Sequence, residues 1–62
     1  MNRPLKARII ECFGNQVDFA RLIGVSEERL SRIIHGRTVP RELEKELIAK
    51  KLGTSLTEIF SN

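Results

Sequence analysis

The chain offers very few side chains that can carry out covalent chemistry or hold a metal ion. Its 62 residues include one histidine, His35, one cysteine, Cys12, and no tryptophan or tyrosine. A Cys/His nucleophile pair needs a third group to orient it, and an ordinary zinc site needs about four ligands at close spacing. The sequence meets neither requirement, so we expect no enzymatic activity, no metal and no cofactor.

Charged side chains are plentiful by comparison. Eleven Lys and Arg against eight Asp and Glu give a net charge of +3 and a pI near 9.6. This balance suits a surface that meets a polyanion, although many ordinary small domains are equally basic. A chain of this length forms one compact domain at most, which we place at residues 1–62, and it leaves little room for a deep ligand pocket. We therefore expect no small-molecule ligand.

The cysteine content and the hydropathy pattern bear on location. A single cysteine excludes an internal disulfide, which fits a reducing compartment. No stretch of eighteen apolar residues occurs, and no apolar run of signal-peptide length follows the N-terminal Met. We expect a cytoplasmic protein with no membrane contact.

The glycines divide the chain into five segments of helical length. Gly14, Gly24, Gly36 and Gly53 each stand singly between segments whose apolar residues recur at three- and four-residue spacing. Asn15, Ser26 and Ser55 are placed to cap helices 16–23, 26–35 and 55–60, while Pro4 and Pro40 are placed to begin the first and fourth helices. The sequence predicts an all-α, five-helix bundle. The residues expected in its core are Leu5, Ile9, Phe19, Ala20, Ile23, Val25, Leu30, Ile33, Ile48 and Leu52, with Leu43 and Leu47 on the inner face of the fourth helix.

The stretch 16–35 is the most specific feature of the sequence. A short helix, a tight Gly24-Val25-Ser26 turn and a second helix follow one another without a spare residue. Ala20 permits the two helices to approach closely, and Gly24 supplies the turn. An unspecialised helical hairpin is the alternative interpretation, but it does not require small and apolar residues at all of these positions.

The dispersed pattern of these residues resembles the phage-repressor and Cro type of helix-turn-helix domain across almost the whole chain. The residues that carry the resemblance are Gln16, Phe19-Ala20, Ile23-Gly24-Val25-Ser26, Leu30, Arg32-Ile33, Gly36, Pro40, Ile48-Ala49, Leu52-Gly53, Ser55-Leu56 and Glu58-Ile59. The resemblance implies a lambda-repressor-like fold that binds double-stranded DNA, with a helix-turn-helix formed by helices 2 and 3. Helix 26–35 would lie in the major groove, and the helix that starts at Gln16 would cross the phosphate backbone.

The same resemblance assigns contacts to individual residues. Bases would be read from the exposed start of the recognition helix by Glu27, Glu28, Arg29 and Arg32. Either glutamate can instead be present only to complement the helix dipole. The phosphate backbone would be contacted by Asn15, Gln16, Ser26, His35, Arg37, Thr38 and Arg41.

One position departs from the family pattern. Where the family often has a glutamate late in the recognition helix, paired with an arginine of the first helix, this chain has Ile34 and, by alignment, Ile9. An apolar pair can replace a buried ion pair without loss of stability. If the alignment slips by one residue, Ile34 is instead exposed and available to an interface.

Apolar residues near the C-terminus bear on the oligomeric state. Leu56, Ile59 and Phe60 form an apolar cluster where the family often dimerises, so we expect a homodimer, or else a cluster that merely closes the core.

The expected function is that of a sequence-specific transcriptional regulator, a repressor of the bacterial or phage kind. The alternative is a protein-binding helical module, such as an antitoxin-like or anti-regulator partner, that uses Glu27, Glu28 and Ile34.

Overall fold

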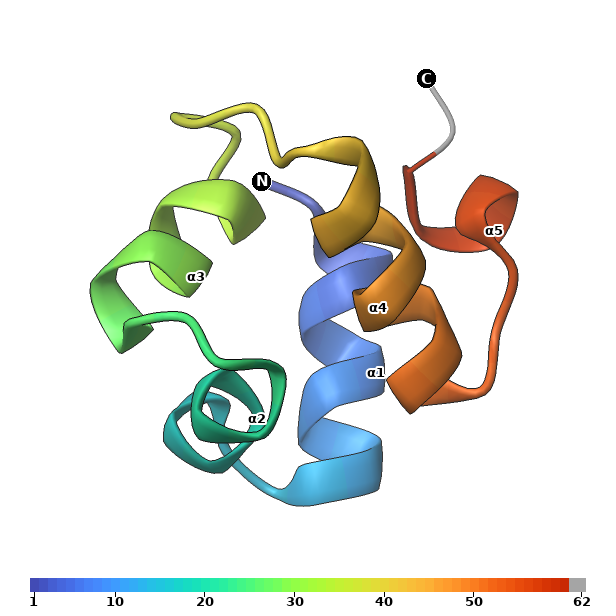
Figure 1. Cartoon of the computed structure of the whole chain (residues 1–62). Coiled ribbons are helices and arrows are strands. Elements are labelled where there is room, and N and C mark those ends of the chain that lie inside the picture. Colours follow the sequence, from blue (N-terminus) through green and yellow to red (C-terminus); the bar gives the residue numbers. More distant parts are fainter. Residues whose placement is uncertain (61–62) are drawn as a thin grey trace.

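The computed structural model describes residues 1–60, and this part of the chain folds into five α-helices that enclose one apolar core (Figure 1). Residues 61 and 62, which the expected domain included, lie outside the described residues. The bounds of the helices are α1 Arg3–Phe13, α2 Gln16–Ile23, α3 Glu27–Ile34, α4 Glu42–Leu52 and α5 Leu56–Phe60. The all-α, five-helix architecture expected from the sequence is confirmed.

Side-chain caps begin α2 and α3 as their sequences predict. Asn15 Oδ1 accepts a hydrogen bond from the Asp18 amide at 2.8 Å, and Ser26 Oγ accepts one from the Arg29 amide at 3.1 Å. Gly24 ends α2 with a φ of 76°, a left-handed conformation that side chains rarely adopt. Local chemistry therefore fixes where both helices start and where the first of them stops.

The N-terminus is held in place by Asn2, which was not among the predicted capping residues. Asn2 caps α1 through its side-chain oxygen, which accepts from the Leu5 amide at 3.1 Å. Its side-chain nitrogen donates to the Ile59 carbonyl at 2.8 Å, and its backbone amide donates to the Ile34 carbonyl at 2.6 Å. Asn2 thus joins the start of α1 to the ends of α3 and α5.

The core draws on all five helices. Nine of the ten residues expected there are buried, and Val25 is partly buried against them. Ile34, Ala49 and Ile59 are buried as well. Within residues 1–60, every residue classed as buried is hydrophobic, and no buried side-chain nitrogen or oxygen lacks a hydrogen-bond partner.

The prediction for the fourth helix was wrong at its start. Pro40 and Arg41 precede the helix, which begins at Glu42, and Leu43 is 78% exposed. Leu47 is only partly buried. The face of α4 that packs inward carries Ile48 and Leu52, and one turn earlier this face presents Glu44, with Leu43 turned toward solvent. The regular spacing of leucines therefore indicated the wrong face at this end.

The C-terminal helix begins with the expected capping box. Ser55 Oγ accepts from the Glu58 amide at 3.3 Å, and the Glu58 carboxylate accepts from the Ser55 amide at 3.2 Å. Hydrogen bonds from the Thr54 hydroxyl, and then from the Ser55 amide and hydroxyl, lower the pKa of Glu58.

None of the five helices combines the length and the apolar character needed to cross a membrane, within the part of the chain that the structure describes.

Candidate nucleic-acid interface

Helices α2 and α3 pack closely around the turn that joins them. Ala20 is buried at their junction, and its carbonyl accepts a hydrogen bond from the Val25 amide at 3.0 Å. The three-residue turn and the small side chain leave α3 little freedom to change its angle to α2. Figure 1 shows α3 at the edge of the molecule, with α1 and α4 between it and α5.

The exposed face of α3 carries most of the residues expected to contact bases. Glu27, Glu28 and Arg32 are exposed, and His35 follows at the end of the helix. Ser31, which was not among the predicted contact residues, is partly exposed and lies one turn after Glu27 and Glu28. Helical periodicity alone would have placed it on this face.

Two interactions orient side chains on this face. Arg32 Nη2 lies 3.0 Å from Glu28 Oε2, one turn apart on the same helix. The His35 ring nitrogen Nδ1 lies 2.8 Å from the Ser31 carbonyl oxygen, and because a carbonyl only accepts, Nδ1 carries the proton in this hydrogen bond. Both side chains of the ion pair between Glu28 and Arg32 are exposed, so a ligand can separate them at little cost in free energy.

Arg29 is engaged differently from its neighbours. Its Nε and Nη2 donate to the two carboxylate oxygens of Glu44, on α4, at 2.8 and 2.7 Å. The arginine side chain is 31% exposed and the glutamate side chain 15%. This two-point hydrogen bond is the main reason that the pKa of Glu44 falls to about 2, and it raises the pKa of Arg29.

The remaining candidates lie at the two ends of the helix-turn-helix. Gln16 begins α2 and is partly exposed, while Asn15 is exposed but already caps the helix and contacts Asp18. After α3, Arg37 and Arg41 are exposed and Thr38 is partly buried. Residues 27–41 contain four arginines and two glutamates, so this part of the surface is basic despite its acidic start.

The structure decides between the two expectations for Ile34. Its side chain is fully buried, as is that of Ile9, and both belong to the same core cluster. An apolar pair thus stands where the family often has an ion pair. The suggestion that Ile34 contacts a protein partner was wrong, because no part of its side chain reaches the surface.

The C-terminal residues expected to form a dimer interface divide between core and surface. Ile59 is 5% exposed and packs in the core, Phe60 is partly buried, and Leu56 is 36% exposed. The area that α5 offers to a partner is therefore smaller than the sequence suggested.

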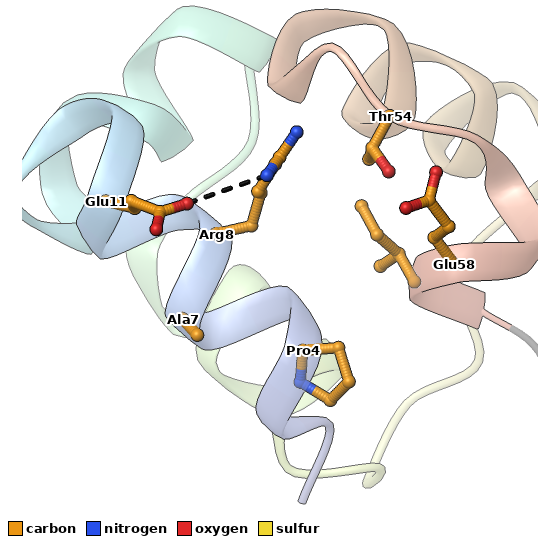
Figure 2. Close-up of a pocket in the computed structure, with 7 residues that line it drawn as sticks. Pro4, Ala7, Arg8, Glu11, Thr54 and Glu58 are labelled. Carbon is orange, nitrogen blue, oxygen red and sulfur yellow. Dashed lines mark ion pairs between the residues drawn. The ribbon is translucent and has the colours of Figure 1, made fainter.

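A pocket of about 250 Å³ lies between α1 and the segment around α5, away from α3 (Figure 2). Its lining residues are Pro4, Ala7, Arg8, Glu11, Thr54, Glu58 and Ile59. The charged groups are engaged locally, because Arg8 contacts Glu11 at 3.6 Å and donates to the Leu52 carbonyl at 3.3 Å. Among residues 1–60, no group of three or more His, Cys, Asp or Glu side chains is arranged to hold a metal ion.

Comparison with known families agrees with this geometry. A family model described as helix-turn-helix matches residues 6–59, which include all of α2, the turn and α3. Comparison with curated proteins and with solved structures gave no match. The match covers most of the chain, and the protein therefore belongs to the XRE-type, or Cro and phage-repressor type, helix-turn-helix family of DNA-binding regulators.

Proposed function

We propose that the protein is a sequence-specific transcriptional regulator, a repressor, that inserts α3 into the major groove of double-stranded DNA. The observation that carries the proposal is the division of α3 into two faces. Leu30, Ile33 and Ile34 fix the helix to the core, while Glu27, Glu28 and Arg32 are free to meet base edges. A cytoplasmic location and the absence of catalysis and cofactors accompany this role.

Base contacts come from the exposed face of α3. Arg32 can leave Glu28 and donate two hydrogen bonds to a guanine, and either Glu27 or Glu28 can accept one from a cytosine amino group. Arg29 lies beside them and is held by Glu44. The backbone contacts that position the helix are proposed for Asn15, Gln16, Ser26, His35, Arg37, Thr38 and Arg41.

Two copies of the chain read one operator in this proposal. Recognition helices of a dimer enter successive major grooves when they lie about 34 Å apart. Leu56 and Phe60 support an interface along α5, with Ile59 beneath them in the core, and Figure 1 shows α5 on the side of the molecule away from α3. Sedimentation across a range of concentrations tests this interface, and a monomer mass at every concentration would rule it out.

The test of DNA binding is fluorescence anisotropy with a randomised duplex pool at about 50 and 200 mM salt, followed by sequencing of the retained DNA. With Arg29 paired and Arg32 at a base, Arg37 and Arg41 remain to neutralise phosphates, so we expect a slope of roughly −2 per protomer in a plot of log affinity against log salt. An enriched, two-fold symmetric site supports a dimeric operator-binding regulator. No binding at low salt, or retention without enrichment, would favour a protein partner for Glu27 and Glu28.

A further inference from the structure

One carboxylate connects the recognition helix to the start of α4. Glu44 Oε1 accepts hydrogen bonds from Arg29 Nη2 and from the Arg41 backbone amide, both at 2.7 Å, and its Oε2 accepts from Arg29 Nε at 2.8 Å. Arg29 lies in the first turn of α3, and Arg41 is the residue that precedes α4. A single side chain therefore links the first turn of the recognition helix to the start of α4.

The loop between α3 and α4 has few other attachments. At its beginning, the Arg37 amide donates to the Arg32 carbonyl at 2.8 Å. Within residues 1–60, no hydrogen bond holds Thr38, Val39 or Pro40 to the rest of the molecule, and Val39 is exposed. The Arg41 carbonyl accepts from the Lys45 amide at 2.9 Å, so Arg41 moves with α4, and the bonds between Arg29 and Glu44 link this end of α4 to α3.

We propose that Arg29 and Glu44 form a clamp that fixes the α3–α4 loop against the recognition helix, so that Arg37 and Arg41 meet phosphates while Arg32 meets bases. The clamp rests on the proposed function and assigns Arg29 to positioning in place of base contact. Contact of Arg29 with a base would remove its guanidinium from Glu44 and leave a mostly buried carboxylate with only one donor. The loop contacts with phosphates and the contacts of α3 with bases therefore depend on the same pair of residues.

The variant Glu44→Gln gives the sharpest test, because electrostatics and the clamp predict opposite results. Removal of a negative charge beside DNA should strengthen binding by simple charge attraction. Loss of the clamp should instead weaken binding by about fivefold and make the salt slope shallower, because Arg37 and Arg41 no longer engage phosphates together. An ion pair that only stabilised the fold would lower the melting temperature and leave the slope unchanged.

Glu42→Gln is the matched control. Glu42 also lies in the first turn of α4, its side chain is 79% exposed, and it contacts only Lys45, at 3.4 Å. The control should bind DNA as tightly as the unsubstituted protein, or more tightly. If Glu44→Gln behaves as this control does, the clamp is wrong.

Arg29→Met separates positioning from base reading. The clamp predicts the same loss of affinity as in Glu44→Gln, no further loss in the double variant, and unchanged base preferences in DNA selected from the random pool. If Arg29 reads a base, Arg29→Met alone relaxes the preference at one position of the site, and the clamp is overturned. Circular dichroism at the assay temperature verifies that every variant is folded.

A second measurement keeps the clamp testable if the proposed function fails and the protein does not bind DNA. Backbone ¹⁵N order parameters of residues 37–39 in the free protein should fall in Arg29→Met and Glu44→Gln and stay unchanged in Glu42→Gln. Unchanged order parameters in all three variants would refute the clamp without reference to DNA. Absence of DNA binding together with loosened loops would refute the proposed function alone.

Discussion

The two faces of α3 differ in both polarity and burial. The inner face is apolar and buried at Leu30, Ile33 and Ile34, so folding itself constrains those residues. The outer face carries Glu27, Glu28 and Arg32, which are exposed and contribute little to the core. In the proposed function, one eight-residue helix separates stability from recognition, and substitutions on each face should affect one property without the other.

The largest effect is expected from placing a charge on the inner face. Ile34→Glu buries an unpaired carboxylate at a position with no solvent exposure, which costs about 3–5 kcal/mol in comparable cases. A 62-residue domain is typically stable by about 3–9 kcal/mol, so much of the protein should be unfolded. Urea denaturation followed by circular dichroism measures the change.

The control restores the charge pattern that the family often has at these positions. Ile9→Arg combined with Ile34→Glu places opposite charges on α1 and α3 within one buried cluster. We expect the double variant to regain part of the stability lost in Ile34→Glu. A single variant as stable as the unsubstituted protein would mean that Ile34 is not packed in the core.

The outer face should give the converse result. Arg32→Ala removes only an exposed pair with Glu28, so the unfolding free energy should change by less than about 0.5 kcal/mol. Affinity for the selected site should fall by about 1–3 kcal/mol, roughly 5- to 150-fold, and specificity at one base pair should relax. Competition with sites altered at single positions measures this. As a control, Arg37→Ala should weaken all sequences alike, and equal behaviour of the two variants would remove Arg32 from base reading.

Local sequence signals were sufficient to predict most of the fold. Glycine punctuation and Asn15 and Ser26 as caps located α2 and α3, because these signals act on neighbouring backbone groups. The start of α4 was not predictable in this way. Glu44 takes a core-facing position only because Arg29, fifteen residues earlier, neutralises it, and a pattern of apolar residues does not register such a pair.

In the candidate interface, too, local features were predictable from the sequence and contacts between distant residues were not. The sequence placed Glu27, Glu28 and Arg32 on one exposed face because helical spacing determines it. It grouped Arg29 with them as a base contact, which stays a prediction, and no local rule reveals that α4 supplies a carboxylate to that side chain. Two of the three attachments of Asn2 are contacts with α3 and α5, so its position near the N-terminus gave no sign of them.

A smaller effect is expected from the Asn2 side chain, which joins the start of α1 to α5. Asn2→Ala removes the cap of α1 and the bond to the Ile59 carbonyl, which should lower stability by about 1–2 kcal/mol. Asn15→Ala is the comparison, because that residue bonds only within its own helix start and should cost about 1 kcal/mol or less. Chemical denaturation of both variants ranks them, and a greater loss from Asn15→Ala would contradict the anchoring role.

The smallest effect is expected at Glu44 of α4, the partner of Arg29, and it appears as a pH dependence of stability. The pKa of Glu44 falls from 4.5 to about 2 on folding, so its contribution to stability is complete above pH 4.5 and is lost as the pH falls toward 2. After allowance for solvent screening, we expect a contribution of about 1 kcal/mol. The difference in urea midpoint between the unsubstituted protein and Glu44→Gln should therefore shrink between pH 6 and pH 3. A constant difference would indicate that the charge of Glu44 does not stabilise the junction of α3 and α4.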